Sequence, residues 1–161
     1  MVCAFTGHRP HKLPWGSEEQ DPRCIAVKTV IEKRLMEALD LGCHTFLCGM
    51  AQGCDLYFAE AVLRLRQQRP EIRLIAMLPC PDQADVWREE DRRRYLSICE
   101  QCDSREVLEP VYSPDCMQKR NRAMVERAQI LISVYDGSPS GTGSTVRYAE
   151  KLGRTILPVW V

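Results

Sequence analysis

The sequence has no net charge, no long hydrophobic run and few aromatic residues. Its 161 residues contain 22 Lys and Arg against 22 Asp and Glu, so no overall basic field can attract a nucleic-acid backbone or an anionic membrane. No apolar stretch approaches the roughly 18–20 residues of a membrane span, and the first residues do not follow the pattern of a signal peptide. We therefore expect a cytoplasmic protein that contacts no membrane, and any site for a polyanion must be local.

The chain also lacks the regular cysteine spacing of a disulfide framework or a zinc site. Its nine cysteines are an odd number at irregular intervals, and several lie in apolar runs such as 45–48. This pattern is typical of free, buried thiols in a reducing compartment. Cys99 and Cys102 form the only CxxC pair, and no histidine follows them. We expect no metal site.

What is present is an ordinary globular composition with alternating elements. Hydrophobic residues make up 45% and charged residues 27%, and the length fits a single domain over residues 1–161. Apolar runs predict strands at 2–5, 44–48, 72–78, 106–108, 129–134 and 155–159. Helical composition lies between them, at 24–41, 55–69, 82–101, 114–128 and 143–152. The alternation predicts an α/β fold: a single Rossmann-like three-layer α/β/α domain with a mostly parallel sheet of about six strands.

The loop that follows the predicted strand at 129–134 has the composition of a phosphate site. Gly141 and Gly143 allow a ligand to approach the main chain closely, and Asp136 precedes them. Hydroxyl groups at the start of the next helix come from Thr142, Ser144 and Thr145. Unpaired N–H groups and the helix dipole attract phosphate there. An ordinary N-cap after a flexible turn would explain the same residues.

Three further segments are expected at the same edge of the sheet, because ligands of open α/β sheets bind outside the carboxyl ends of the strands. Their candidate ligand-binding residues are Gly7, His8, Arg9, Gly49, Gly53, Asp55, Arg120 and Asn121. A cation such as Arg9 could neutralise a phosphate, His8 could stack or exchange a proton, and Asp55 could accept hydrogen bonds from ribose hydroxyls. Loop, cap and surface-charge roles explain each of these residues singly.

Taken together, these segments resemble a known superfamily. The matching stretches are Thr6-Gly7-His8-Arg9-Pro10, Gly49 to Glu60, Pro81 to Trp87 and Ser113 to Ala149. They resemble the SLOG superfamily, the Rossmann-like group named after STING and the LOG proteins, and most closely its YpsA-like branch. The resemblance implies a pocket for a nucleotide or a nucleotide-derived ligand, such as a nucleoside monophosphate, ADP-ribose or NAD. It implies no other cofactor.

Within this superfamily, LOG-type phosphoribohydrolases release a base from a nucleoside monophosphate. They carry an Arg in the helix before a Pro-Gly-Gly-x-Gly-Thr-x-x-Glu signature, and here Met117-x-x-Arg120 resembles that helix. Arg147 stands at the position of the catalytic Glu, although glycosidic cleavage needs a carboxylate. Hydrolysis that releases a base or phosphate would then need another carboxylate, with His8 as the acid or base. The candidate carboxylates are Asp55, Glu60 and Asp136.

The core of DprA, a protein that binds single-stranded DNA, is a more distant resemblance. Gly49 to Asp55 and Arg120-Asn121-Arg122 look similar to it. Because the chain is neutral, we do not expect it to bind nucleic acid. The leading hypothesis is a cytoplasmic domain that binds or senses a nucleotide-type ligand, with LOG-like hydrolysis and then DNA binding as alternatives. A homo-oligomer remains open, because nothing in the sequence fixes an interface.

Overall fold

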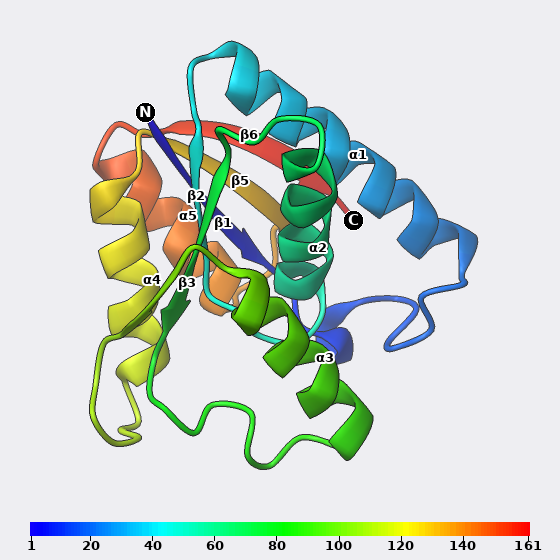
Figure 1. Cartoon of the computed structure of the whole chain (residues 1–161), viewed down its shortest axis with the longest axis vertical. Helices are drawn as coiled ribbons and strands as arrows, with labels where there is room; N and C mark the ends of the chain where they lie inside the picture. The colour runs from blue at the N-terminus through cyan, green and yellow to red at the C-terminus, as the bar shows by residue number, and fades with distance from the viewer.

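A six-stranded, entirely parallel sheet forms the centre of the computed structural model, which describes residues 1–161 (Figure 1). Its strands are β1 (Val2–Gly7), β2 (Thr45–Cys48), β3 (Arg73–Leu78), β4 (Ser104–Val107), β5 (Ile130–Tyr135) and β6 (Thr155–Trp160). They lie in the order β4-β3-β2-β1-β5-β6, and every neighbouring pair is parallel. After β1, the chain adds β2, β3 and β4 on one side of it, and then returns to add β5 and β6 on the other side. The topological switch point, where such sheets bind ligands, therefore lies between the ends of β1 and β5.

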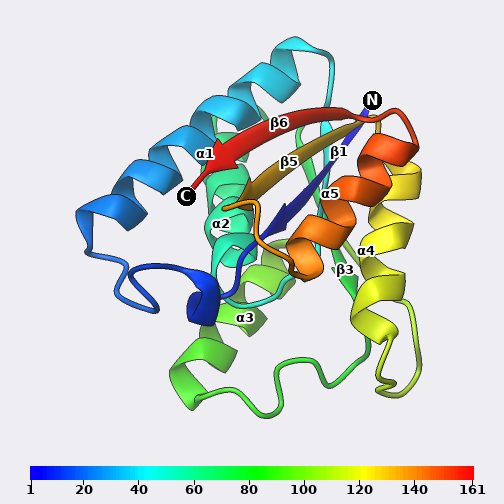
Figure 2. The same ribbon diagram turned by 180° about the vertical axis from the view of Figure 1, so that it is seen from behind.

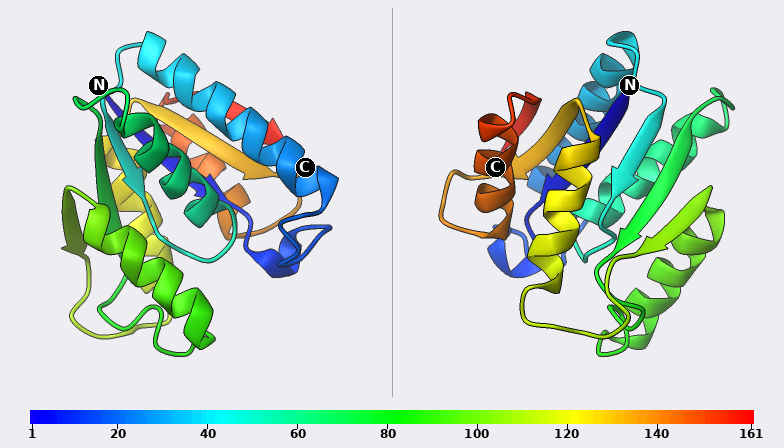
Figure 3. Two further views of the ribbon diagram at one scale, coloured as in Figure 1. Left: turned by 45° about the vertical axis from the view of Figure 1, so that its right-hand side comes forward. Right: turned by 90° about the vertical axis from the view of Figure 1, so that its left-hand side faces the viewer.

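Five helices cover the two faces of this sheet. Their bounds are α1 (Pro22–Asp40), α2 (Cys54–Arg66), α3 (Glu89–Gln101), α4 (Cys116–Arg127) and α5 (Gly141–Lys151), and a 3-10 helix η1 (Pro10–Lys12) follows β1. Helices α1 to α3 lie on one face, and α4 and α5 lie side by side on the other (Figures 2 and 3). The two groups connect strands in opposite directions along the sheet, and right-handed crossovers then fall on opposite faces. This confirms the predicted Rossmann-like three-layer domain. None of the helices combines the length and the apolar composition that crossing a bilayer requires.

The two faces divide the core by the two-residue period of the strands. In β1, Cys3 and Phe5 belong to the larger apolar cluster beneath α1 to α3, whereas Ala4 belongs to the smaller one beneath α4 and α5. Phe5 stacks on Phe58 of α2, with 4.4 Å between the ring centroids. The apolar cluster beneath α4 and α5 has nine buried residues, against thirty-four in the cluster beneath α1 to α3.

The helix predicted at 82–101 begins only at Glu89. Residues 79–88 instead form an irregular connection, in which Gln83 is buried. Its amide donates hydrogen bonds to the carbonyls of Gly49, at 3.2 Å, and Met50, at 3.4 Å. Tertiary contacts thus override a helical composition in this segment. The other predicted elements differ from the structure by a few residues at their ends, as is usual for helix boundaries.

Candidate functional site: a cationic cleft at the switch point

A cleft of about 690 Å³ opens beside the ends of β1 and β5. It is lined by the loop after β1, by η1, by the loop between β2 and α2, and by α4 and α5. Six of its lining residues are cationic, namely Arg9, Lys12, Arg120, Arg122, Arg147 and Lys151. Asp55 is the only carboxylate among the lining residues. The cleft is therefore strongly positive although the whole chain is neutral.

None of these six cations takes part in an ion pair within the protein. The ion pairs use eleven other basic side chains, which are Arg23, Lys28, Arg34, Arg64, Arg66, Arg69, Arg88, Arg93, Arg94, Lys119 and Arg127. Carboxylates thus neutralise half of the Lys and Arg residues, and the cleft cations other than the buried Arg120 remain free for an external anion. A sequence with equal numbers of opposite charges does not reveal this separation.

The N-terminus of α5 adds backbone donors to the cleft. Ser140 caps the helix: its Oγ accepts from the N–H of Gly143 at 3.0 Å, and its carbonyl accepts from the N–H of Ser144 at 2.9 Å. The N–H groups of Gly141 and Thr142 have no hydrogen-bond partner in the protein. The first turn therefore offers two free amides and the positive end of the helix dipole.

The predicted ligand-binding residues at the start of α5 do not all face the cleft. The cleft is lined by Gly141, Thr142, Ser144 and Thr145. Gly143 lies behind them with its amide already bonded, and a Cβ there would lie 3.1 Å from the Ser138 carbonyl oxygen. We find that Gly143 allows close packing within the loop, while its neighbours face the cleft.

Arg120 holds the loop between β2 and α2 in place. Its side chain is buried, with 3% of the residue exposed, and its guanidinium donates to the carbonyls of Gly49 and Met77. The guanidinium leaves no room for a Cβ at Gly49. Its Nε donates to Oδ1 of Asn121 at 2.8 Å. Because these bonds occupy much of its donor capacity, Arg120 positions the loop more than it contacts a ligand.

Asp55 lies beside this guanidinium at the base of the cleft. Its Oδ2 accepts from the N–H of Ala51 at 3.0 Å, and the residue is buried. Burial raises the pKa of the Asp55 carboxyl, and the positive charge of Arg120 acts in the opposite direction. The carboxylate thus lines the cleft, but one of its oxygen atoms already accepts a hydrogen bond from the preceding loop.

His8 and Asp136 join the ends of β1 and β5 across the switch point. The buried His8 places Nε2 at 3.1 Å from Oδ1 and 3.2 Å from the backbone N of Asp136. The side-chain and backbone donors of Ser138, followed by His8, hold the pKa of Asp136 below its usual range. His8 lines the cleft and Asp136 does not. Asp136 is therefore placed to orient the imidazole and the loop that leads to α5.

The loops after β1 and β2 are in direct contact. Gly53 has φ +85°, and a Cβ there would lie 2.8 Å from the backbone oxygen of His8. The N–H of Cys54 donates to that same oxygen at 3.3 Å. A Cβ at Gly7 would meet the Cβ of Cys54. Neither Gly49 nor Gly53 lines the cleft. Gly53 lets the two loops pack, whereas Gly49 makes room for the Arg120 guanidinium.

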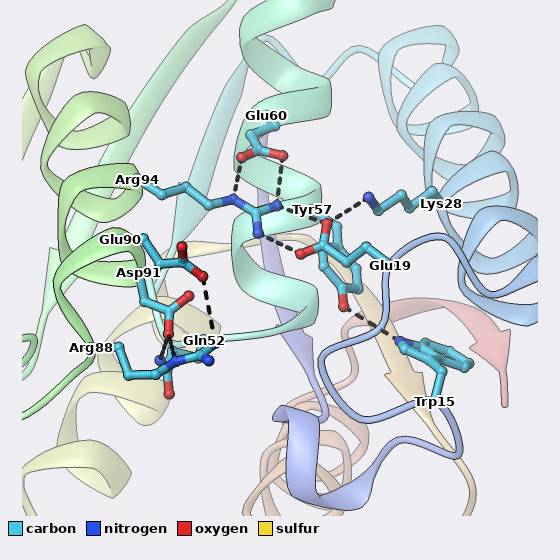
Figure 4. A network of polar contacts seen from close by, with 10 residues as sticks. All are labelled: Trp15, Glu19, Lys28, Gln52, Tyr57, Glu60, Arg88, Glu90, Asp91 and Arg94. Carbon is cyan, nitrogen blue, oxygen red and sulfur yellow. Dashed lines mark hydrogen bonds and ion pairs between the residues drawn. The ribbon is translucent and has the colours of Figure 1, made fainter.

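Glu60 lies away from the cleft in a separate polar network (Figure 4). Arg94 of α3 donates to Glu60 at 2.6 Å and to Oε1 of Glu19 at 3.0 Å. Glu19 also accepts from Lys28 of α1 at 2.7 Å. Nearby, the indole N–H of Trp15 donates to the Tyr57 hydroxyl at 3.4 Å. The network fastens residues 15–19 to α1, α2 and α3, and so anchors the segment that carries Arg9 and Lys12 into the cleft.

Sequence reasoning missed part of the cleft. Lys12, Arg122 and Lys151 were not predicted as binding residues, and Arg147 was singled out only as a departure from the LOG pattern. The available signal was the spacing of Ser144, Arg147 and Lys151, which places them on one face of a helix. That signal does not distinguish a ligand site from a solvated surface until α4 is packed beside α5.

A parallel sheet with a capped helix start and a cationic cleft at its switch point defines a Rossmann-like domain suited to anionic ligands. Comparison with known proteins gives the family. The chain belongs to the YpsA family: the family model described as the YspA SLOG family matches residues 3–153. This confirms the resemblance seen in the sequence.

The relatives and the solved structures agree with this assignment. The chain is 30% identical over 158 residues to a UPF0398 protein of Bacillus velezensis, covering 96% of this chain and 86% of that protein. It is 28% identical over 144 residues to the UPF0398 protein YpsA of Bacillus subtilis, covering 88% and 79% of the two chains.

Two solved structures of DNA processing protein A share the fold. The Streptococcus pneumoniae protein aligns with a TM-score of 0.62 at 18% identity, over 98% of this chain and 49% of that one. The Helicobacter pylori protein, whose structure is reported for its single-stranded DNA binding mode, gives 0.63 at 17%, over 98% and 64%. The chain thus spans from half to two thirds of those proteins, and the likeness concerns the fold.

Proposed function

We propose that the cleft binds a nucleotide or a nucleotide-derived ligand, such as a nucleoside monophosphate, ADP-ribose or NAD, through its phosphate. The observation that carries the proposal is six Lys and Arg without carboxylate partners around two free amides. Like charges gathered in this way repel one another, and a bound anion relieves that repulsion. The volume of about 690 Å³ lies within the usual range for small-molecule sites. Binding requires no chemical step, so a sensing role in the cytoplasm follows.

In this proposal each group has a distinct role. The amides of Gly141 and Thr142 hold a phosphate at the N-terminus of α5, and Arg9 and Arg147 supply charge. Asp55 accepts a hydrogen bond from a sugar hydroxyl at the base of the cleft. Arg120 and His8 keep the surrounding loops in register. These roles are supported by the lining of the cleft and by the hydrogen bonds described above.

A substitution at Gly141 tests the phosphate position directly. Gly141 is the first residue of α5 and is preceded by Ser140 in an extended conformation, so proline is tolerated there. Gly141→Pro deletes one free N–H, whereas Gly141→Ala keeps it, and a Cβ at this position meets nothing within 4 Å. We expect the Kd for AMP, ADP-ribose or NAD, followed by thermal shift and calorimetry, to rise about tenfold in Gly141→Pro only. Equal affinity in both variants, or no binding by the wild type, would contradict the proposal.

Hydrolysis of the same ligand is an alternative that one carboxylate favours. Asp55 lines the cleft and its pKa is raised by burial, a property shared by many general acids. Arg147, at the place of the LOG glutamate, argues against turnover. Incubation with AMP, NAD and ADP-ribose separates the two functions by chromatography of free base and phosphate. Intact ligand supports sensing, and release that disappears in Asp55→Asn supports hydrolysis.

Single-stranded DNA is a second candidate, favoured by the local positive charge. The expectation that the chain does not bind nucleic acid rested on its neutrality, but the cleft collects six cations without partners. The likeness to a protein that binds single-stranded DNA concerns the fold. Binding of an unphosphorylated oligonucleotide that weakens steeply with salt would support this function.

A further inference from the structure

The cleft continues from the switch point along the groove between α4 and α5. The two helices run side by side from the carboxyl end of the sheet (Figures 2 and 3). On α5 the lining residues Ser144, Arg147, Tyr148 and Lys151 are three or four positions apart and so share one face. Lys151 is the last residue of this helix, and Gly141 is the first. At the rise of an α-helix, the two ends of this lining are about 15 Å apart.

The far part of this groove is cationic and is held in shape. Arg122 of α4 and Lys151 of α5 line it, and neither forms an ion pair. The guanidinium of Arg122 lies over the Tyr148 ring, 5.2 Å from its centroid. Arg147 instead reaches back to the first turn of α5: its guanidinium donates to Ser144 Oγ at 3.0 Å, and a Cβ at Gly143 would lie 3.4 Å from its nearer nitrogen.

The neighbouring carboxylates do not neutralise the cations at the far end of the groove. Glu126 accepts from the hydroxyl of Tyr148 at 2.7 Å, and neither Glu126 nor Glu150 lines the cleft. Arg122 and Lys151 thus remain free at the end of the groove away from the free amides of α5. The cleft has two separate positions for an anion.

The distance between the two anion positions restricts which ligands can occupy both. The two phosphates of a pyrophosphate share an oxygen atom and are therefore adjacent, so NAD, ADP and ADP-ribose would fill only one of the two positions. Phosphates on either side of a nucleoside are further apart and can reach both. We propose that the cleft binds a short single-stranded oligonucleotide with a 5′-terminal phosphate, the smallest being a 5′-phosphorylated dinucleotide. This inference rests on the proposed function and names the class of its ligand.

In the bound state, the amides of Gly141 and Thr142 hold one phosphate together with Arg147, and Arg122 and Lys151 hold the other. Two lining residues at the start of α4 offer apolar surface for a sugar or base: Met117 within the helix and Pro114 just before it. The terminal phosphate carries more charge than an internal phosphodiester, so it gains most from the helix dipole. The ligand then lies along α5 with its 5′ end at the switch point.

Calorimetry with four probes tests the inference on the whole chain. The probes are AMP, ADP, the 5′-phosphorylated dinucleotide pApA and the dinucleoside monophosphate ApA, which lacks the terminal phosphate. We expect pApA to bind at least about tenfold more tightly than AMP, ADP or ApA, because only pApA can occupy both positions. Its salt dependence should be steeper than that of AMP by about 0.7 in log K against log salt, the value for one further contact on a single strand.

Substitutions test which residues form the second anion position. The double variant Arg122→Gln with Lys151→Gln should bind pApA about as weakly as AMP while AMP affinity changes less than about twofold. The matched control is Lys33→Gln with Arg105→Gln, which removes two exposed cations outside the cleft and outside any ion pair, and it should keep the preference for pApA. Circular dichroism and melting temperature show whether the variants fold.

Each outcome is decisive. If AMP binds but pApA binds no better, or if the double variant weakens AMP and pApA equally, the two-position inference is wrong and the proposed function stands. If none of the probes binds, both are wrong. If ApA binds as tightly as pApA, the terminal phosphate has no role and the inference fails in favour of general single-strand binding.

Discussion

At Gly53 a single missing side chain allows two loops to meet at the switch point. Its φ of +85° is strained for other residues, and a Cβ would lie 2.8 Å from the backbone oxygen of His8. We expect Gly53→Ala to lower the free energy of unfolding by at least about 2 kcal/mol, because both strain and a backbone clash oppose it. For a chain of this length, that corresponds to a fall in Tm of about 4–8 °C.

Gly141→Ala is the control for this prediction, because a Cβ at Gly141 meets nothing within 4 Å. Its Tm should stay within about 2 °C of the wild type. Differential scanning calorimetry measures both variants. A Gly53→Ala protein as stable as Gly141→Ala would show that the two loops do not pack as the structure places them.

The cysteines offer a second prediction for individual residues. Eight of the nine are buried, and only Cys102 is intermediate. Burial raises the pKa of the Cys102 thiol to about 12, so little thiolate forms near pH 8. We expect Ellman's reagent to modify at most one thiol per native chain and nine after denaturation in guanidinium. Cys102→Ser should abolish the native reaction, whereas several fast-reacting thiols in the native chain would contradict the buried placement.

Among the elements, the connection between β1 and α1 depends on α3 for its position. Arg94 of α3 bridges Glu19 of this connection and Glu60 of α2, and it does not line the cleft (Figure 4). Arg94→Gln leaves Glu60 without its cation and leaves Glu19 paired with Lys28 alone. We expect it to lower the free energy of unfolding by about 1 kcal/mol, a small value because these groups are partly exposed. Hydrogen exchange in residues 9–19 should become faster, because the anchor of this segment is lost.

Ligand affinity should fall about threefold in the same variant, since the freed segment carries Arg9 and Lys12. Arg93→Gln is the matched control: Arg93 lies on the same helix and pairs with Glu89, and both side chains are mostly exposed. Denaturant titration, exchange and calorimetry report the three effects. Faster exchange with unchanged affinity would show that this segment does not shape the cleft.

The elements also show how much of the fold and of the candidate site can be predicted from the sequence. The alternation of apolar runs and helical stretches gives the order of strands and helices. The runs that form β1, β2 and β5 are mostly buried, whereas the edge strand β4 is exposed along its length. The start of α3 could not be predicted, because Gln83 bonds to Gly49 and Met50, residues more than thirty positions away in the chain. Gly7, Gly49 and Gly53 are predicted from the sequence as ligand-binding residues. Gly7 lines the cleft, whereas Gly49 and Gly53 do not: Gly49 makes room for the Arg120 guanidinium, and Gly53 makes room for the backbone of the loop after β1.

For the whole molecule, the separation of charge matters more than its sum. The formal net charge is zero, yet the six cations of the cleft have no carboxylate partners and most other basic residues do. The fields of the two opposite charges in an ion pair largely cancel beyond a few ångströms. Salt further limits the range of any remaining charge to about 10 Å at 0.1 M. We therefore expect the unpaired cations of the cleft to contribute most to the interaction of the protein with an anionic surface.

This separation predicts retention of a neutral protein on phosphocellulose. At pH 7.5 and low salt we expect the wild type to bind and to elute in a salt gradient, because cleft cations meet the phosphate groups of the matrix. The triple variant Arg122→Gln, Arg147→Gln and Lys151→Gln should elute at distinctly lower salt. A control triple variant removes the same charge from three cations outside both the cleft and the ion pairs, as Lys33→Gln, Arg92→Gln and Arg105→Gln. It should elute close to the wild type. Equal shifts in the two triple variants would mean that net charge alone governs retention, in which case the cleft would not be the anion-binding surface of the molecule.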